Sequence, residues 1–482
     1  MVFTTSSRTT NKAAEPAVRG SDMDGLLYEI VLALGLGLLG AILFSAIGLI
    51  SGTDETTTIA PVTLLVVLLG APPAGVFTFW MCAAISKHMT HAVPTALLGI
   101  PGDTLALPLL QQATALRNLG APHVALRKML AGSVISAFVA VPLAVLFAVI
   151  LAPFGTYITA SAPWLFIGAA VIIAYFSAGR WASVVALVPF TLIIVALQGF
   201  TAANNVKLGV SYFLGIAVGP LVAELVSALS PLEKRRMNRG ELRQTTLAPD
   251  VKSWGGYFPN PFRVLDRSQV TTTAAAAAVT SATFVFSPVA VTVIAGEIVG
   301  ARIKHAYHRL TSVLAVRNGV TESTYIAEAL IPLIAFGLPL SPVAAGPAAP
   351  LFNAPPRFTV DTATGAVNNL HTMMSVPEFL VWGLISVVIA AAIAYPFAMN
   401  HARSAAAFVA KYISHEAIIA TFVGLVLVIG LWEGGILALL VIVTVGLVGG
   451  ILYRALGMNT GVQFMGYYAA ILSVPAIMKL LG

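Results

Sequence analysis

The sequence has very little charge and almost no cysteine. Of its 482 residues, only 9% are charged, and Cys82 is the single cysteine. A soluble domain carries about 25% charged residues, so a soluble globular protein is excluded. One cysteine also excludes disulfides within the chain and zinc sites built from several cysteines. Because Cys82 lies in an apolar segment, we expect a small buried core residue rather than a reactive thiol.

Hydrophobic residues take the place of the missing charge. They make up 58% of the chain, and the mean hydropathy is +0.92. Uncharged apolar runs of about 20 residues are candidate membrane spans. Such runs, one of them shorter, are Ile30–Ser51, Met129–Ile150, Ala417–Leu431 and Gly434–Leu452. The fold class predicted is an all-α polytopic integral membrane protein, and the length allows roughly ten to fourteen spans.

Two polar segments divide the chain. Residues 1–25 are polar and rich in Ser and Thr, which predicts a short disordered tail. A cleavable signal peptide is not expected, because the apolar run that follows is too long for one. Residues 232–269 hold eight Lys/Arg against four Asp/Glu, which predicts a cytoplasmic linker by the positive-inside rule. Membrane topology is therefore sufficient to explain much of the net charge of +7, and no nucleic-acid partner is expected. Residues 26–231 and 270–482 are the two transmembrane parts.

The two transmembrane parts show weak internal repetition. Laying "LLGIPGDTLALP" over "AFGLPLSPVAAGP" pairs Gly99 with Gly337, Ile100 with Leu338 and Pro101 with Pro339, at an offset of 337 − 99 = 238. Farther upstream, Ser45 pairs with Ser281 at an offset of 281 − 45 = 236. The nearly equal offsets predict two pseudo-repeats, each with broken or re-entrant helical hairpins. Transporter architecture suggests that the repeats are inverted.

The repeated breaks are candidates for a substrate site. Non-helical backbone at membrane depth is tolerated only where protein or a water-filled cavity satisfies its polar groups. In secondary transporters the half-helix ends at such breaks face anions, and freed carbonyls hold cations. An ordinary surface loop is the alternative, since Gly, Pro and Asp are common turn residues. The candidate substrate-binding residues here are Gly99, Ile100, Pro101, Gly102, Asp103, Thr104, Gly337, Leu338, Pro339 and Ser341.

A cationic group precedes the first break. Lys87, His88 and His91 are spaced so that they can share one helical face. They can pair with an anionic substrate or relay protons, and we include them among the substrate-binding candidates. The alternative is a cluster at the membrane boundary that reaches toward lipid headgroups. No metal site is expected, because two histidines without a nearby carboxylate are weak evidence for one.

Acidic residues supply candidates for ion coupling. Asp54, Glu55, Thr56 and Thr57 in "SGTDETTT" form an oxygen-rich group that suits a cation or a buried proton carrier. An exposed acidic turn is the alternative. In "TESTYIAEALIP" we prefer Glu322 to Glu328 as a further coupling residue, with an acid at a helix start as the alternative. No cofactor is expected beyond the coupling ion, H⁺ or Na⁺.

Three stretches resemble a known family. They are "AIGLISGTDETTTIAPVTLLV", "PTALLGIPGDTLALP" and "NGVTESTYIAEALIPLIAFGLPLSP", and they are similar to the large permease subunit of the tripartite tricarboxylate transporters, the TctA type. The resemblance covers about Ala46–Ala131 and Asn318–Leu351 and aligns Glu322 with a family glutamate. It implies a permease for carboxylates such as citrate, driven by a cation gradient, with a small membrane subunit and a periplasmic binding protein as partners. The second break lacks the family's closing glycine, having Leu340 instead, so a different anionic cargo stays open.

The predicted function is secondary active transport of an organic anion, with a carboxylate favoured, across the cytoplasmic (inner) membrane of a prokaryote. The driving force is a proton or sodium gradient, because the sequence has no P-loop. Catalytic motifs such as a nucleophile elbow are absent too, so no enzyme is predicted. The main alternative is a translocase for an anionic lipid such as a polyprenyl phosphate carrier; a channel or a receptor is weaker. Membrane lipid is an expected partner, and a homo-oligomer is compatible with the sequence.

Overall fold

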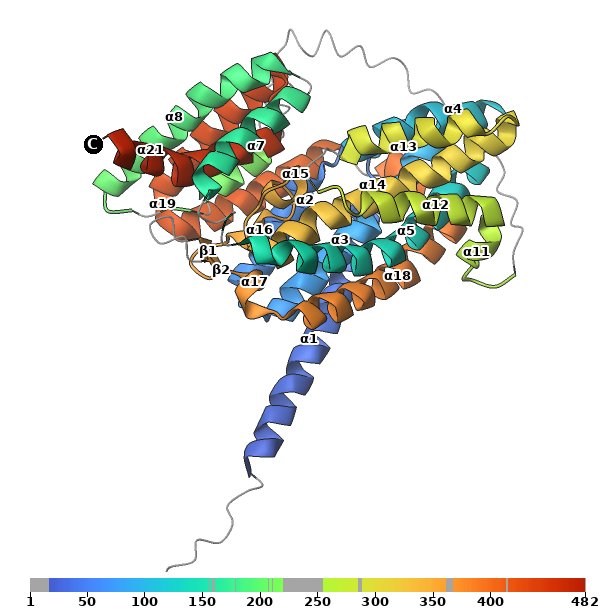
Figure 1. Ribbon diagram of the computed structural model, residues 1–482, viewed down its shortest axis with the longest axis horizontal. Helices are drawn as coiled ribbons and strands as arrows, with labels where there is room; N and C mark the ends of the chain where they lie inside the picture. The colour runs from blue at the N-terminus through green and yellow to red at the C-terminus, as the bar shows by residue number, and fades with distance from the viewer. Residues whose placement is uncertain are drawn as a thin grey trace, which may run out of the picture.

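The computed structural model describes most of the chain (Figure 1). The described residues are 17–155, 157, 161–177, 179–206, 208–209, 211–219, 255–284, 288–360, 367–412 and 415–481. The predicted tail lies outside them up to residue 16, and helix α1 (Ala17–Ile47) begins within the segment expected to be disordered. The predicted linker lies outside them up to residue 254, and its last residues form α11 (Pro261–Val264) and the start of α12 (Arg267–Thr280).

Five helical stretches in the described part are long and apolar enough to cross a membrane. They are Leu27–Ile47, Pro122–Phe154, Trp181–Ala203, Val376–Val409 and Val423–Leu456. These stretches belong to α1, α5 (Pro122–Leu151) with η3 (Ala152–Phe154), α8 (Trp181–Ala203), α18 (Val376–Tyr412) and α19 (His415–Leu456). Shorter apolar helices in the described part are Glu55–Leu68 and Phe166–Phe176. The chain is thus an all-α, multi-pass membrane protein.

Two helices form the buried centre of the molecule. In α3 (Pro73–Thr90) every residue from Gly75 onward is buried, and in α14 (Ala306–Phe336) so is every residue from Thr311 onward. Helix α3 packs against α1 and α18, while α14 packs against α5, α12 and α13 (Pro288–Arg302). A second group of helices, α7 (Ala162–Phe176), α8, α19 and α20 (Thr460–Tyr468), packs at one side of this centre (Figure 1).

The remaining elements are short and lie between the long helices. They are α2 (Glu55–Leu68), η1 (Pro94–Leu98), η2 (Thr104–Leu109), α4 (Leu110–Asn118), α15 (Pro342–Ala345), α16 (Ala349–Phe352), β1 (Thr359–Val360), β2 (Val367–Asn368), α17 (Leu370–Met373), η4 (Ala469–Ser473) and α21 (Val474–Leu481). The two strands pair antiparallel, with Thr359 opposite Asn368.

Glycines mark the interruptions that the sequence predicted. Gly99 and Gly337 have φ of 70° and 64°, in the left-handed region that favours glycine, and each ends a helical segment. Within α19 the backbone departs from helical geometry at Gly434 and Gly435, between the two apolar runs distinguished in the sequence. The predicted breaks at Gly99–Gly102 and Gly337–Pro339 are therefore non-helical.

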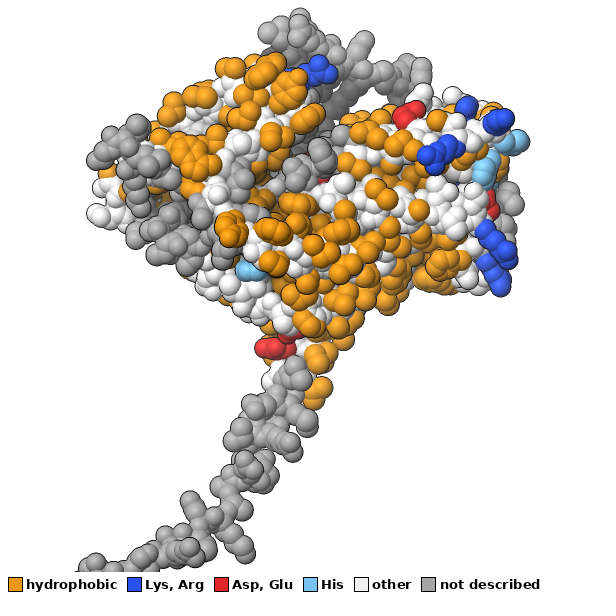
Figure 2. Space-filling model, viewed as in Figure 1, with side chains coloured by type: hydrophobic (Ala, Val, Ile, Leu, Met, Phe, Trp, Pro, Cys, Tyr) orange, Lys and Arg blue, Asp and Glu red, His pale blue; other side chains and the backbone are white. Residues whose placement is uncertain are grey.

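The surface separates apolar and basic side chains. Figure 2 shows hydrophobic side chains over most of the visible face, with Lys and Arg gathered at the edge near α4 and α11–α13. An extensive exposed apolar surface of this kind is a place of contact with lipid or with another protein.

Candidate functional site

The non-helical segment at Ser51–Gly52, between α1 and α2, and the break at Gly99–Gly102 form one hydrogen-bonded unit. The Gly52 amide donates to the Gly102 carbonyl (2.8 Å), and Ser51 Oγ donates to the Pro101 carbonyl (2.5 Å). The Gly102 amide in turn donates to Thr95 Oγ1 (3.1 Å). The polar backbone groups of Pro101 and Gly102 are thus satisfied by the Gly52 amide and by the hydroxyls of Ser51 and Thr95, as buried non-helical backbone requires.

Gly102 permits the close approach of this unit to α3. A Cβ at this position would lie 2.6 Å from the carbonyl oxygen of His91 and 2.9 Å from its Cα, so a side chain would displace backbone. At Gly99 a Cβ would meet only the guanidinium of Arg117, which can move, and the constraint there is the positive φ. The two glycines are therefore required for different reasons.

A buried charge network lies against this unit. Lys87 Nζ lies 2.9 Å from Glu55 Oε1 and 3.0 Å from Asp103 Oδ2, and the Lys87 side chain is 0% exposed. His91 Nδ1 lies 2.9 Å from the same Asp103 oxygen. Lone buried charges are very costly, so these groups depend on one another. The structure therefore joins Glu55, predicted for ion coupling, with three predicted substrate-binding residues in a single network.

Local capping positions the acids of the network. Asp103 begins η2, and its Oδ1 accepts from the Ala106 amide (3.0 Å), which leaves Oδ2 for the cations. Asp54 is the N-cap of α2, where its Oδ1 accepts from the Thr56 amide (2.8 Å). The Asp54 carbonyl accepts from Thr57 Oγ1 (3.0 Å). Asp54 and Thr57 thus serve the helix start, while Glu55 points its carboxylate to Lys87.

Helix α14 from the second half completes the site. Asn318 Oδ1 lies 3.3 Å from His91 Nε2, and its Nδ2 donates to the Met129 carbonyl (2.8 Å). Glu322 Oε1 lies 3.5 Å from His88 Nδ1, which is long for a hydrogen bond. Residues far apart in the chain, on α3 and α14, therefore form adjoining parts of one buried polar centre.

Tyr325 is a residue of this centre that sequence reasoning missed. Its ring centroid lies 4.3 Å from that of His88, edge to face, and it stacks on Trp80 at 6.0 Å. Within the described residues, neither the Tyr325 hydroxyl nor either His88 ring nitrogen has a hydrogen-bond partner. Since 325 − 87 = 238, Tyr325 stands at the repeat offset from Lys87, and extending the alignment would have found it. Asn318 and Ser133, whose Oγ donates to Glu322 Oε2 (2.7 Å), gave no such signal.

Several predicted residues lie outside the network. The Ile100 side chain is 43% exposed, and Thr104 is exposed as well. Gly337 packs against α17, where a Cβ would lie 2.9 Å from His371 Cβ. The other predicted residues of the second break are buried, and they are Leu338, Pro339 and Ser341. Among the described residues, no hydrogen bond or ion pair links the second break to Lys87.

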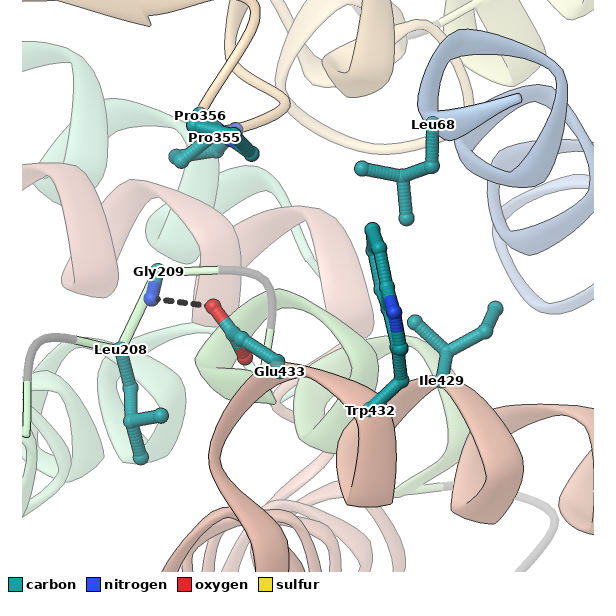
Figure 3. Close-up of a pocket in the computed structure, with 8 residues that line it drawn as sticks. All are labelled: Leu68, Leu208, Gly209, Pro355, Pro356, Ile429, Trp432 and Glu433. Atoms are coloured by element: carbon teal, nitrogen blue, oxygen red, sulfur yellow. Dashed lines mark hydrogen bonds between the residues drawn. The ribbon is translucent and has the colours of Figure 1, made fainter. Parts of the chain in front are cut away.

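A separate cavity of about 470 Å³ lies beside the interruption of α19 (Figure 3). It is lined by Leu68, Leu208, Gly209, Pro355, Pro356, Ile429, Trp432 and Glu433. Glu433 accepts from the amides of Gly209 (2.8 Å) and Ser211 (2.7 Å), so this carboxylate holds two backbone segments together. No residue predicted from the sequence lines this cavity. In the part of the chain that the structure describes, no group of three or more His, Cys, Asp or Glu side chains is placed to hold a metal ion.

Comparison with known proteins addresses the resemblance seen in the sequence. Neither the comparison with curated proteins nor that with solved structures gives a match. The model of the family described as "Tripartite tricarboxylate transporter TctA family" matches residues 34–460, which is nearly the whole chain and includes every residue of the network. The expected family is therefore confirmed, and the chain belongs to the tripartite tricarboxylate transporter TctA family.

Proposed function

We propose that this chain is the permease subunit of a secondary active transporter for an organic anion, with a carboxylate as the favoured substrate and a proton or sodium gradient as the driving force. The observation that carries the proposal is the buried network in which Lys87 lies between Glu55 and Asp103. A fully buried lysine beside interrupted helices is a suitable binding group for a carboxylate. Ionisable groups inside a membrane protein commonly mark the path of a substrate or ion.

The network supports a competition between substrate and protein carboxylates. A carboxylate that binds Lys87 must replace Glu55 or Asp103 as the partner of the ammonium group. Asp103 retains His91 and the Ala106 amide after such a replacement. Among the described side chains, Lys87 is the only cationic partner of Glu55, whose other polar neighbour is the acid Asp103. Glu55 is therefore the carboxylate that substrate displaces.

Displacement of Glu55 would provide the coupling. Once released from Lys87, its buried carboxylate would be an uncompensated charge, which costs several kcal/mol. Binding of H⁺ or Na⁺ at Glu55 removes that cost, so substrate and cation bind together more favourably than either alone. Among the predicted coupling residues, Asp54, Thr56 and Thr57 hold the start of α2. Glu322 accepts a hydrogen bond from Ser133 and lies 3.5 Å from His88.

We also propose that the two halves are pseudo-repeats, which we expect to be inverted. Gly99 and Gly337 share left-handed backbone, and four residues later Asp103 and Ser341 both cap a short helix through an amide 3.0 Å away. Packing agrees with this pairing, because α3 contacts α1 and α18 while α14 contacts α12 and α5. If α3 corresponds to α14, α1 to α12 and α18 to α5, the contacts of α3 in one half become the contacts of α14 in the other. An arrangement of this type supports alternating access around a central site.

The family name describes a tripartite system, and we propose a small membrane subunit and a periplasmic binding protein as partners in the cytoplasmic membrane of a prokaryote. Membership in a transporter family supports a permease rather than an enzyme. It gives no support to the lipid-translocase alternative.

Transport by the full chain in proteoliposomes tests the proposal. Uptake of labelled citrate, with mono- and dicarboxylates as competitors, would be measured under imposed proton or sodium gradients. We expect gradient-dependent uptake that Lys87→Gln reduces at least tenfold and that Lys304→Gln, a change at an exposed lysine, leaves near wild type. Uptake by Lys87→Gln equal to wild type, or movement of an anionic lipid without carboxylate uptake, would contradict it.

A further inference from the structure

Glu328 is a buried carboxylate that the proposed mechanism does not use. Its side chain lies on α14 and is 0% exposed. Its Oε2 accepts a hydrogen bond from the Val343 amide, at 3.3 Å. Oε1 has no hydrogen-bond partner among the described residues.

Glu328 differs from the other buried acids of the centre in having no basic side chain beside it among the described residues. Glu55 and Asp103 share Lys87, and Glu322 lies near His88. Within the described chain no Lys, Arg or His nitrogen lies within the 4.0 Å of an ion pair from Glu328. A buried carboxylate without a cationic partner must be neutralised by a proton or a bound cation.

The surroundings of Glu328 supply further oxygen atoms but little charge. Thr324 precedes Glu328 by four residues, so the two side chains lie on one face of α14. The buried Thr324 Oγ1 also has no hydrogen-bond partner in the described part of the chain. Along α14 itself the titratable residues next to Glu328 in sequence are Glu322 and Tyr325, and Tyr325 contacts His88 of α3. Of the other elements that contact α14, α17 carries His371, α15 has no titratable residue, and α5 has none after Lys128.

We propose that Glu328, with Thr324, is a second binding site for the monovalent coupling cation, H⁺ or Na⁺, separate from the Lys87 network. The site lies beside the second break, whereas Glu55 lies at the start of α2, next to the segment that is hydrogen-bonded to the first break through Gly52. This inference rests on the proposed function, because it assigns a second cation to the same transporter.

Hydrogen bonds of the second break connect the Glu328 site to α3, the helix that carries Lys87. The Glu328 carboxylate reaches the amide of Val343 in α15, and Ser341 Oγ donates to the Glu328 carbonyl (2.6 Å). The segment that follows approaches the first half, where Trp80 Nε1 donates to the Pro347 carbonyl (2.9 Å). Neutralising or ionising Glu328 would therefore alter the position of a segment that also touches α3, the helix of Lys87.

Cation binding by the purified full chain tests this proposal without any substrate. Thermal unfolding would be followed in sodium and in choline at equal ionic strength, and the infrared band of protonated carboxyl groups would be followed with pH. For a sodium site, we expect a sodium-dependent rise in Tm in wild type that Glu328→Gln abolishes and Thr324→Val weakens at least tenfold in apparent sodium affinity. For a proton site, we expect no sodium effect, and Glu328→Gln removes one titrating infrared band that Thr324→Val retains.

Glu378→Gln is the matched control, because Glu378 is exposed and its loss should leave the sodium effect on Tm and the band of the buried Glu328 carboxyl unchanged. Should Glu328→Gln fail to fold, Glu328→Asp keeps the charge and is expected to weaken sodium binding or shift the infrared titration. If neither variant at Glu328 changes either signal, the proposal is overturned. Failure of citrate uptake in wild type, by contrast, would contradict the proposed function while these binding signals remain measurable.

Discussion

Replacing Lys87 by Met gives the most direct test of the buried network. The change keeps an unbranched side chain of similar length and removes the ammonium group that lies 2.9 Å from Glu55 and 3.0 Å from Asp103. Breaking a buried ion pair by removing one partner costs about 3–5 kcal/mol, because the other charge stays buried. We expect Lys87→Met to lower the free energy of unfolding by that amount.

The structure also predicts which second change restores stability. In the Lys87→Met protein, Asp103 keeps His91 at 2.9 Å and the Ala106 amide at 3.0 Å. Glu55, by contrast, loses the only ion-pair partner that it has among the residues described. Adding Glu55→Gln should therefore recover most of the lost free energy, and adding Asp103→Asn should recover less. The deficit of Lys87→Met should also shrink as the pH falls, because a protonated Glu55 carries no charge.

Unfolding of the purified variants in mixed detergent micelles, followed by tryptophan fluorescence, provides the measurement. The four proteins of each double-mutant cycle give the interaction free energy of the pair. The reasoning is refuted if Lys87→Met costs less than roughly 1 kcal/mol, the range of an exposed ion pair. It is refuted equally if Asp103→Asn restores Lys87→Met as well as Glu55→Gln does.

Further predictions concern the first break, the coupling acid and the topology. Gly102→Ala should abolish transport because its Cβ would lie 2.6 Å from a backbone oxygen, whereas Gly99→Ala should cost about 1–3 kcal/mol of stability and retain some activity. Uptake and thermal unfolding distinguish the two, and equal effects would contradict this account. Glu55→Gln should uncouple substrate accumulation from the ion gradient in proteoliposomes. Asp54→Asn keeps the N-cap of α2, so its free energy of unfolding should stay within about 0.5 kcal/mol of wild type and its transport should remain coupled. The reverse result would place coupling elsewhere. A cysteine introduced at Ser253, in a chain without the native cysteine, should resist labelling from outside intact cells if the basic linker is cytoplasmic; efficient labelling would reverse the orientation.

Local chemistry explains what could be predicted from the sequence. The scarcity of charge identified a membrane protein, and Gly99 and Gly337 marked the places where helical backbone ends. The spacing of Lys87, His88 and His91 placed them together at the end of one helix. The family resemblance depended on the same short segments and was confirmed over residues 34–460. Each of these properties follows from neighbouring residues, so no knowledge of the fold was required.

Separate roles for the charged residues could not be established in this way. The sequence suggested one group for the substrate and another for the ion, but Lys87 contacts Glu55 and Asp103 at once. It favoured Glu322 over Glu328, although Glu322 lies near a histidine and Glu328 has no cation beside it among the described residues.

The class of the protein, its family and the positions of its helix breaks could be read from the order of residues alone, because composition, glycine and proline act through local backbone and solvation. The three-dimensional packing of the helices was needed to learn which charges share a partner and that Asn318, Glu322 and Tyr325 lie beside α3. The free energy of a buried charge depends on the atoms within a few ångströms of it. In this protein those atoms come from segments as far apart as His91 and Asn318, and folding alone brings them together.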